Sequence, residues 1–98
     1  MSCALIAAAY YGDLTKAEHL LHCGADVGER DQDSVTALHF AAGEGHVRTA
    51  ALLLARGADV DARDRAQCTP LHAAVKMGRR EIVDLLLAHQ ADVEAKER

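Results

Sequence analysis

The residues best suited to bind a metal ion or to attack a substrate are six histidines and three cysteines. Three of them lie close together in the sequence, at His19, His22 and Cys23. Histidines three positions apart share one face of a helix, and imidazole and thiolate are common zinc ligands. A structural zinc site needs four ligands that are supported by further hydrogen bonds, and the spacing offers no fourth. We therefore expect no metal and no cofactor, and we keep a metal-dependent module as the least favoured alternative.

Nucleophilic catalysis is the second chemistry that the cysteines could support. A reactive cysteine requires a neighbouring base and electropositive surroundings. Cys68 directly precedes Thr69 in an expected loop, and we interpret it as an accessible but ordinary thiol. The odd number of cysteines without a CxxC spacing indicates reduced thiols, as in cytosolic or nuclear proteins. Since no glycine-rich phosphate loop follows a strand either, we expect a protein that is not an enzyme.

The composition narrows both the fold and the partners. Half of the residues are apolar but only three are aromatic, and the abundance of alanine and leucine favours packed helices over sheets. The net charge of −4 is mild, and no basic stripe with interleaved aromatic residues indicates nucleic-acid binding. No stretch approaches the roughly 20 apolar residues of a membrane span. We expect neither a nucleic acid nor a membrane as partner, and a cytoplasmic or nuclear location.

The sequence repeats itself with a period of 33 residues, and such a period is typical of stacked repeat proteins. Residues 36–39 (TALH) fall on 69–72 (TPLH), 52–55 (LLLA) on 85–88 (LLLA), and 24–27 (GADV) on 57–60 (GADV). Three units, 1–32, 33–65 and 66–98, therefore fill a single domain.

Each unit is expected to form two short helices. In the second unit, Thr36 is suited to cap a helix over residues 37–44, because its hydroxyl can accept a hydrogen bond from an unpaired N–H group. Gly45 can end that helix in the left-handed conformation, and a second helix over residues 47–56 is expected to stop at Gly57. Helices of this length are not stable alone, so each unit must bury its apolar face on a neighbour.

Residues 36–39 and 69–72, the pair Gly45-His46 and the leucines before residues 57–60 resemble the ankyrin repeat. The tetrapeptide, the glycine and the leucines recur in phase, and the resemblance covers essentially the whole chain. The resemblance implies an all-α stack of helical pairs with short hairpin loops on one side. It also implies a non-enzymatic adaptor, scaffold or inhibitor that binds another protein through a concave groove of first helices and hairpin tips. His39 and His72 stand at the signature histidine position, where we expect a structural role that links adjacent repeats.

Some positions depart from the ankyrin pattern. Residues 3–6 (CALI) replace the signature tetrapeptide of the first unit, with Ser2 as a substitute cap. Ser34 and Gln67 stand where the family commonly has the glycine of the hairpin turn, so we expect less regular hairpin tips. Gln90 replaces the second helix-ending glycine, which should strain or loosen the last turn.

The last unit is as apolar as an internal one. Residues 82–88 (IVDLLLA) would leave an apolar face at the end of the stack, whereas terminal repeats normally carry a polar outer face. Two explanations follow. Either the chain is part of a longer ankyrin array whose binding surface lies in other repeats, or this end docks something, such as a second copy of the chain or a cap.

Carried over position by position, the resemblance assigns partner binding to the outward side of the first helices, the hairpin tips and the flanking arms. These positions are Tyr10, Tyr11, Gly43, Glu44, Lys76 and Met77 in the helices, Gln32, Asp33, Val35, Arg65, Ala66 and Cys68 in the tips, and Arg30, Arg63 and Lys96 in the arms.

Three features of that set favour binding. Tyrosine is over-represented among residues that carry binding energy, which favours Tyr10 and Tyr11 as contacts over the alternative that they only pack over the exposed end of the first repeat. Val35 beside charged neighbours is interpreted as an exposed apolar tip. The groove is expected to be acidic near the first unit and basic near Arg63 and Lys76, which favours a partner segment of opposite polarity.

Overall fold

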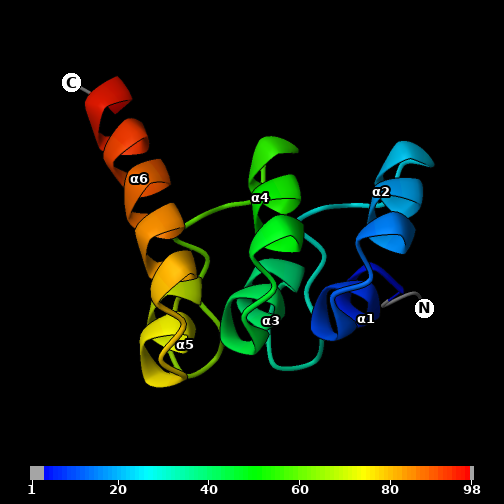
Figure 1. Ribbon diagram of the computed structural model, residues 1–98, viewed down its shortest axis with the longest axis horizontal. Coiled ribbons are helices and arrows are strands. Elements are labelled where there is room, and N and C mark those ends of the chain that lie inside the picture. The colour runs from blue at the N-terminus through cyan, green and yellow to red at the C-terminus, as the bar shows by residue number, and fades with distance from the viewer. Residues whose placement is uncertain (1–3, 98) are drawn as a thin grey trace.

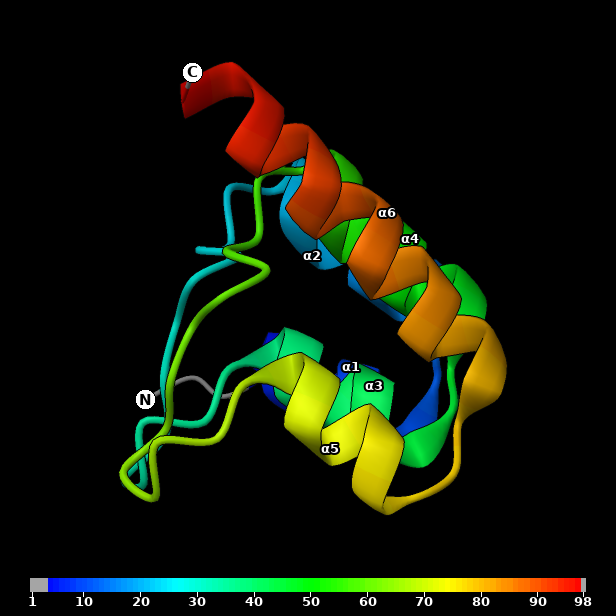
Figure 2. The same ribbon diagram turned by 90° about the vertical axis from the view of Figure 1, so that its left-hand side faces the viewer.

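The helices fold as three antiparallel pairs that stand side by side (Figure 1). The computed structural model describes residues 4–97, with side chains as far as residue 89. In chain order the helices are α1 (Ala4–Tyr11), α2 (Leu14–His22), α3 (Ala37–Glu44), α4 (Val47–Ala55), α5 (Pro70–Lys76) and α6 (Arg80–Glu97). The first helices of the pairs, α1, α3 and α5, form one layer, and α2, α4 and α6 form the other (Figure 2).

This arrangement confirms the predicted all-α repeat stack. Within residues 4–97, β pairing is limited to an isolated antiparallel bridge between Arg30 and Thr36, at the base of the first hairpin loop. None of the helices in that range is long and apolar enough to cross a membrane.

The threonine caps form as the sequence predicts. The side chain of Thr36 accepts a hydrogen bond of 3.3 Å from the backbone N–H of His39, and Nδ1 of His39 accepts one of 3.1 Å from the backbone N–H of Thr36. Thr69 and His72 make the same two bonds, at 3.3 and 3.0 Å. Each reciprocal pair satisfies two donors that a helix start leaves unpaired, so α3 and α5 begin at defined residues.

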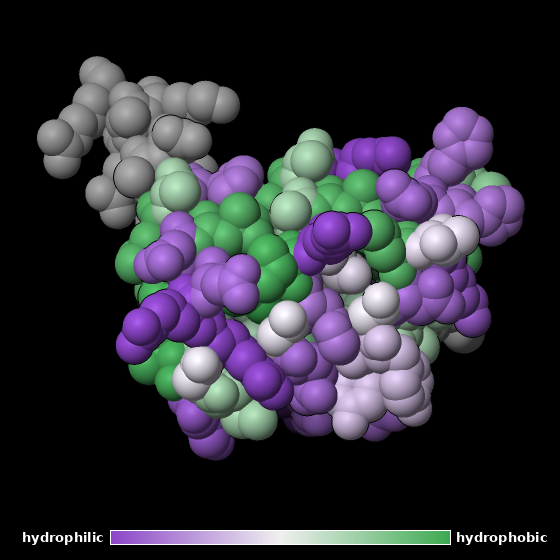
Figure 3. All heavy atoms as spheres, viewed as in Figure 1, coloured by the Kyte–Doolittle hydropathy of each residue, from purple (hydrophilic) through white to green (hydrophobic). Residues whose placement is uncertain are grey.

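Alanine allows the first helices to approach one another closely. Ala9 and Ala42 are fully buried within the layer in which α1 packs on α3 and α3 on α5. Leu38 and Leu53 are buried in the same hydrophobic core. On the outer side, hydrophobic residues gather over α4 and α6 among hydrophilic ones (Figure 3). The core is thus continuous across the three pairs and belongs to none of them alone.

Glycine is required in the turns of the first two pairs for two reasons. Gly12 and Gly45 have φ angles of 71° and 81°, a region that side chains rarely allow. A Cβ atom would also lie 2.5 Å from Nδ1 of His46 at Gly12, and 3.0 Å from Cδ of Arg79 at Gly45. Both of these side chains come from the turn of the following repeat. The glycines therefore control how closely successive pairs approach.

The two hairpin tips have the same hydrogen-bond pattern, and the expectation of irregular tips was wrong. Oδ1 of Asp31 accepts bonds from the backbone N–H groups of the residues two and four positions later, at 2.9 and 3.0 Å. Oδ1 of Asp64 does the same, at 2.9 Å each. Ser34 and Gln67 adopt φ angles of 63° and 66°, the conformation that glycine would take there. The aspartate holds each turn in place although its left-handed residue is not glycine.

The last helix also differs from the prediction. Gln90 was expected to strain or loosen the end of a short helix, but α6 continues through it to Glu97, because no glycine stops the helix at this position. Position 96, assigned to a strand-like arm, lies in this helix instead. Ser2, proposed as a cap, lies outside the described residues. In the second pair, α4 ends at Ala55, one residue earlier than expected.

The left-handed tip residues lead to a testable prediction. A side chain in the left-handed region costs on the order of 1–2 kcal/mol, which exceeds the roughly 0.5–1 kcal/mol that glycine loses in conformational entropy on folding. Ser34→Gly and Gln67→Gly should therefore each raise the free energy of unfolding by about 0.5 kcal/mol, measured by urea denaturation. Gln32→Gly is the matched control, since Gln32 does not adopt a positive φ. Equal stabilisation by all three substitutions would contradict this explanation.

Candidate partner-binding surface

A hollow of about 540 Å³ opens between the second hairpin tip and α5. It is lined by Asp64, Ala66, Gln67, Cys68, His72, Ala73 and Lys76. Three of the residues predicted to bind a partner, Ala66, Cys68 and Lys76, therefore come together around one concavity. Ala66 and Lys76 are exposed, whereas Cys68 is half-buried.

The two hairpin tips are tied to each other by backbone atoms and one arginine. The backbone N–H of Arg65 donates to the carbonyl of Asp33 at 3.0 Å. Nη1 of Arg30 donates to the carbonyl of Ser34 at 2.9 Å and to that of Arg63, in the next repeat, at 2.8 Å. Arg30 is thus engaged within the protein, and it fixes the spacing of the tips. The side chains of Asp33, Arg63 and Arg65 remain exposed beside it.

The two tyrosines differ in their surroundings. The Tyr11 side chain is 76% exposed. Tyr10 packs edge-to-face on Phe40 of the second repeat, with ring centroids 5.7 Å apart, and on Tyr11 at 4.9 Å. Tyr10 therefore supports the contact between repeats, and it does not pack over the outer end of the first. Tyr10 is still 41% exposed, but Tyr11 is the more accessible side chain of the pair.

Two residues of the predicted set lie elsewhere than expected. Val35 is half-buried and its backbone N–H is bound by Asp31, so the interpretation as an exposed apolar tip was wrong. Gly43 is buried, and a Cβ atom there would lie 3.7 Å from that of Ala73, so it serves helix packing. Gln32 and Met77 are exposed, and Glu44 is half-buried.

His39 links neighbouring repeats, as the sequence predicts. Its Nδ1 accepts from the backbone N–H of Thr36 at 3.1 Å, so the ring proton lies on Nε2. Nε2 is 2.8 Å from the carbonyl oxygen of Cys68 in the third repeat, to which it donates. His72 repeats the contact with its own threonine through Nδ1, but its side chain is exposed at the end of the described stack.

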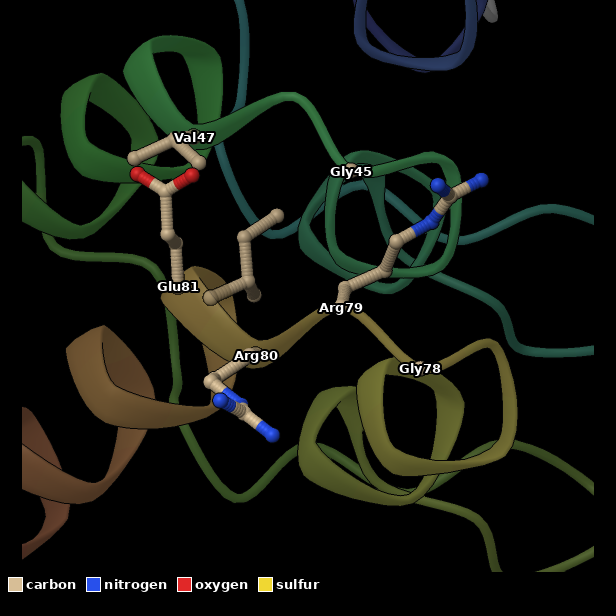
Figure 4. A pocket seen from close by; sticks show the side chains of 7 residues that line it. Gly45, Val47, Gly78, Arg79, Arg80 and Glu81 are labelled. Atoms are coloured by element: carbon tan, nitrogen blue, oxygen red, sulfur yellow. The ribbon is translucent and has the colours of Figure 1, made fainter.

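Sequence reasoning missed a second link between repeats. Nε2 of His46 donates to the carbonyl of Tyr10 at 3.0 Å, and Nε of Arg79 donates to that of Gly43 at 3.1 Å. These carbonyls lie in the last turns of α1 and α3, where intrahelical partners are lacking and positive charge is favoured. Figure 4 shows Arg79 extending past Gly45. The period could have revealed the pair, because positions 46 and 79 are 33 residues apart.

The candidate metal ligands come together only in part. Sγ of Cys23 lies 3.7 Å from Nε2 of His19. Among the side chains that the structure describes, no group of three or more histidine, cysteine, aspartate or glutamate residues gathers in a metal-binding arrangement. Cys23 and Cys68 are both free thiols.

Stacked helical pairs, reciprocal threonine–histidine caps and projecting hairpin tips define a helical repeat solenoid. A family model for ankyrin repeats, in three copies, matches residues 5–97, and the chain belongs to the ankyrin-repeat family. Members of this family are generally protein–protein interaction modules and are generally not enzymes. No curated protein matches the chain significantly.

The unequal surroundings of the two signature histidines can be tested by substitution. His39→Ala removes the cap contact and also leaves the Cys68 carbonyl without its donor, so it should lower the free energy of unfolding by about 2–4 kcal/mol. His72→Ala removes only the contacts with Thr69, and about 1–2 kcal/mol is expected. Urea denaturation of both variants measures the difference. Equal losses would show that the bond to Cys68 contributes nothing to the stability.

Proposed function

We propose that the protein is a non-enzymatic adaptor, scaffold or inhibitor that binds another protein through its hairpin surface. We define the hairpin surface as the two tips, 31–35 and 64–68, with the outward sides of α1, α3 and α5, as far as Tyr11, Glu44 and Lys76 at the ends of these helices. The observation that carries the proposal is the hollow between the second tip and α5, which three of the predicted contact residues line. Concave sites with a few convergent polar groups are the usual places for recognition.

The hairpin surface is rigid before any partner arrives. Asp31 and Asp64 each hold two backbone N–H groups of their own tip, and Arg30 ties the first tip to the second. A preorganised surface loses little conformational entropy when it binds. Modest contacts with exposed side chains, such as Tyr11, then suffice for useful affinity.

The charges of the hairpin surface favour an extended partner segment of mixed charge. The exposed charged residues are Asp33 on the first tip, Arg65 on the second tip and Lys76 on α5. A segment with its basic part near Asp33 and its acidic part near Lys76 matches this order, so binding should weaken as salt is added. The free thiols of Cys23 and Cys68 support a cytoplasmic or nuclear location for the interaction.

Tyr11 provides the sharpest test of this function. The immobilised protein should capture a partner from a cell lysate, and the affinity of that purified partner can then be measured by calorimetry. Tyr11→Ala should weaken binding by about 1–3 kcal/mol, because exposed tyrosines commonly carry binding energy. The same variant should change the stability by less than about 0.5 kcal/mol, because the side chain is mostly in solvent.

Two control variants accompany this experiment. Arg56→Ala changes an exposed residue at the end of α4, in the opposite layer, and should leave the affinity unchanged. Tyr10→Ala removes the ring contact with Phe40 and should lower the stability by about 1 kcal/mol, so it is unsuitable as a binding variant. A partner that binds the wild type and Tyr11→Ala equally, but loses affinity with Arg56→Ala, would contradict the proposed surface.

A further inference from the structure

The end of the stack formed by α5 and α6 carries exposed apolar side chains. Figure 2 looks onto this end, where both helices lie in front of the rest of the chain. Val75 on α5 is 60% exposed and Leu87 on α6 is 47% exposed. Between the two helices lies a hollow of about 280 Å³, lined by Ala74, Val75, Gly78, Arg79, Arg80 and Val83. We call Val75, Val83 and Leu87 with this hollow the end face.

The same positions in the first two repeats show what covers such a face. Ala9 and Ala42 precede Val75 by two periods and one period, and both are 0% exposed. Leu54 precedes Leu87 by one period and is 8% exposed. In the inner repeats, helices of the next pair pack over the preceding pair, α3 on α1, α5 on α3 and α6 on α4. The end face therefore occupies the positions at which the inner repeats receive the helices of the next pair.

The charges beside the end face are mainly positive. Arg79 and Arg80 line the hollow, and no carboxylate does. Arg79 is occupied by the carbonyl of Gly43, whereas Arg80 points away from Arg79 in Figure 4 and is exposed, as is Lys76. Among residues 80–89 of α6, the acidic residues are Glu81 and Asp84, and Asp84 is exposed. Glu81 points toward Val47 of the second repeat (Figure 4).

This charge pattern disfavours a second copy of the chain as the occupant. In a head-to-tail stack, the end face would meet the outer side of α2. There the exposed Lys16 and His19 replace the buried Thr49 and the half-buried Leu52 of the second repeat, so a charge would be buried against apolar side chains. In a symmetric tail-to-tail pair, Arg80 would approach its own copy, and like charges repel.

We propose that the end face binds an amphipathic helix of another protein, whose apolar stripe covers Val75, Val83 and Leu87 and whose acidic flanks lie beside Arg80 and Lys76. Helices that lay an apolar stripe into a groove are a common mode of recognition. This surface does not include the exposed Tyr11 or the first hairpin tip, but it shares Lys76 with the hollow beside the second tip.

A synthetic helical peptide tests the proposal directly. The probe is a fluorescent peptide about 18 residues long, enough to form a helix, with leucine at positions i, i+3, i+4 and i+7 and glutamate on the flanks. Its anisotropy is titrated with the whole protein at low salt. Saturable binding is expected, and a matched peptide with lysine for glutamate should bind at least about tenfold more weakly because its charge is reversed.

Variants of the protein locate the binding. Val75→Asp and Leu87→Asp place a carboxylate on the end face, from different helices, and each should weaken binding of the glutamate peptide by about tenfold or more. Two variants are used because each can be checked for helicity independently of the other. Tyr11→Ala, on the hairpin surface, should leave this affinity unchanged, which separates this proposal from the proposed function.

Three results would overturn the proposal. The first is a lack of saturable binding by the glutamate peptide. The second is equal binding of the two peptides, or no effect of Val75→Asp and Leu87→Asp. The third is a wild-type protein that sediments as a dimer and becomes a monomer with either aspartate variant, since the end face would then belong to a second copy.

Discussion

No helical pair in this protein can bury its own apolar residues, and the rest of the structure depends on this constraint. The helices of the first two pairs have eight or nine residues, too short to persist alone. Alanines at the contacts bring the helices of the first layer close together, and the glycine turns leave room for a side chain from the next repeat. Stability is therefore a property of the interfaces between pairs.

Hydrogen bonds cross those interfaces in both directions along the stack. The carbonyls of Tyr10 and Gly43 accept from His46 and Arg79 of the following turn. Arg30 donates forward to a carbonyl of the second repeat, and His39 donates to one of the third. Helix ends and hairpin tips, which carry unpaired backbone groups, are satisfied across repeats in this way. The hairpin surface is rigid as a result of the same bonds that hold the stack together.

Features that depend on neighbouring residues in the sequence were predictable, whereas contacts between residues of different repeats were harder to predict. The Thr36 cap and the Gly45 stop need only neighbouring residues, and the structure has them as predicted. The residue type at Ser34 led to a wrong prediction. Glycine adopts the left-handed conformation at the lowest cost, but the hydrogen bonds of Asp31 enforce the same conformation on another residue. Whether Tyr10 is free or packed depends on Phe40, thirty positions away, and no local pattern encodes that contact. For the candidate surface, sequence could name positions but not their exposure.

The outermost helices at the two ends of the described stack differ in the polarity of their exposed side chains. At the N-terminal end, Lys16 and His19 turn the outer side of α2 polar, so that water can cover it. At the other end, Val75 and Leu87 keep the chemistry of an internal interface. Covering an exposed interface side chain with apolar surface lowers the free energy of the complex. An exposed tip residue such as Arg65, in contrast, can be substituted without destabilising the core. Helix-directed recognition therefore arises at the end face from packing rules already used inside the stack.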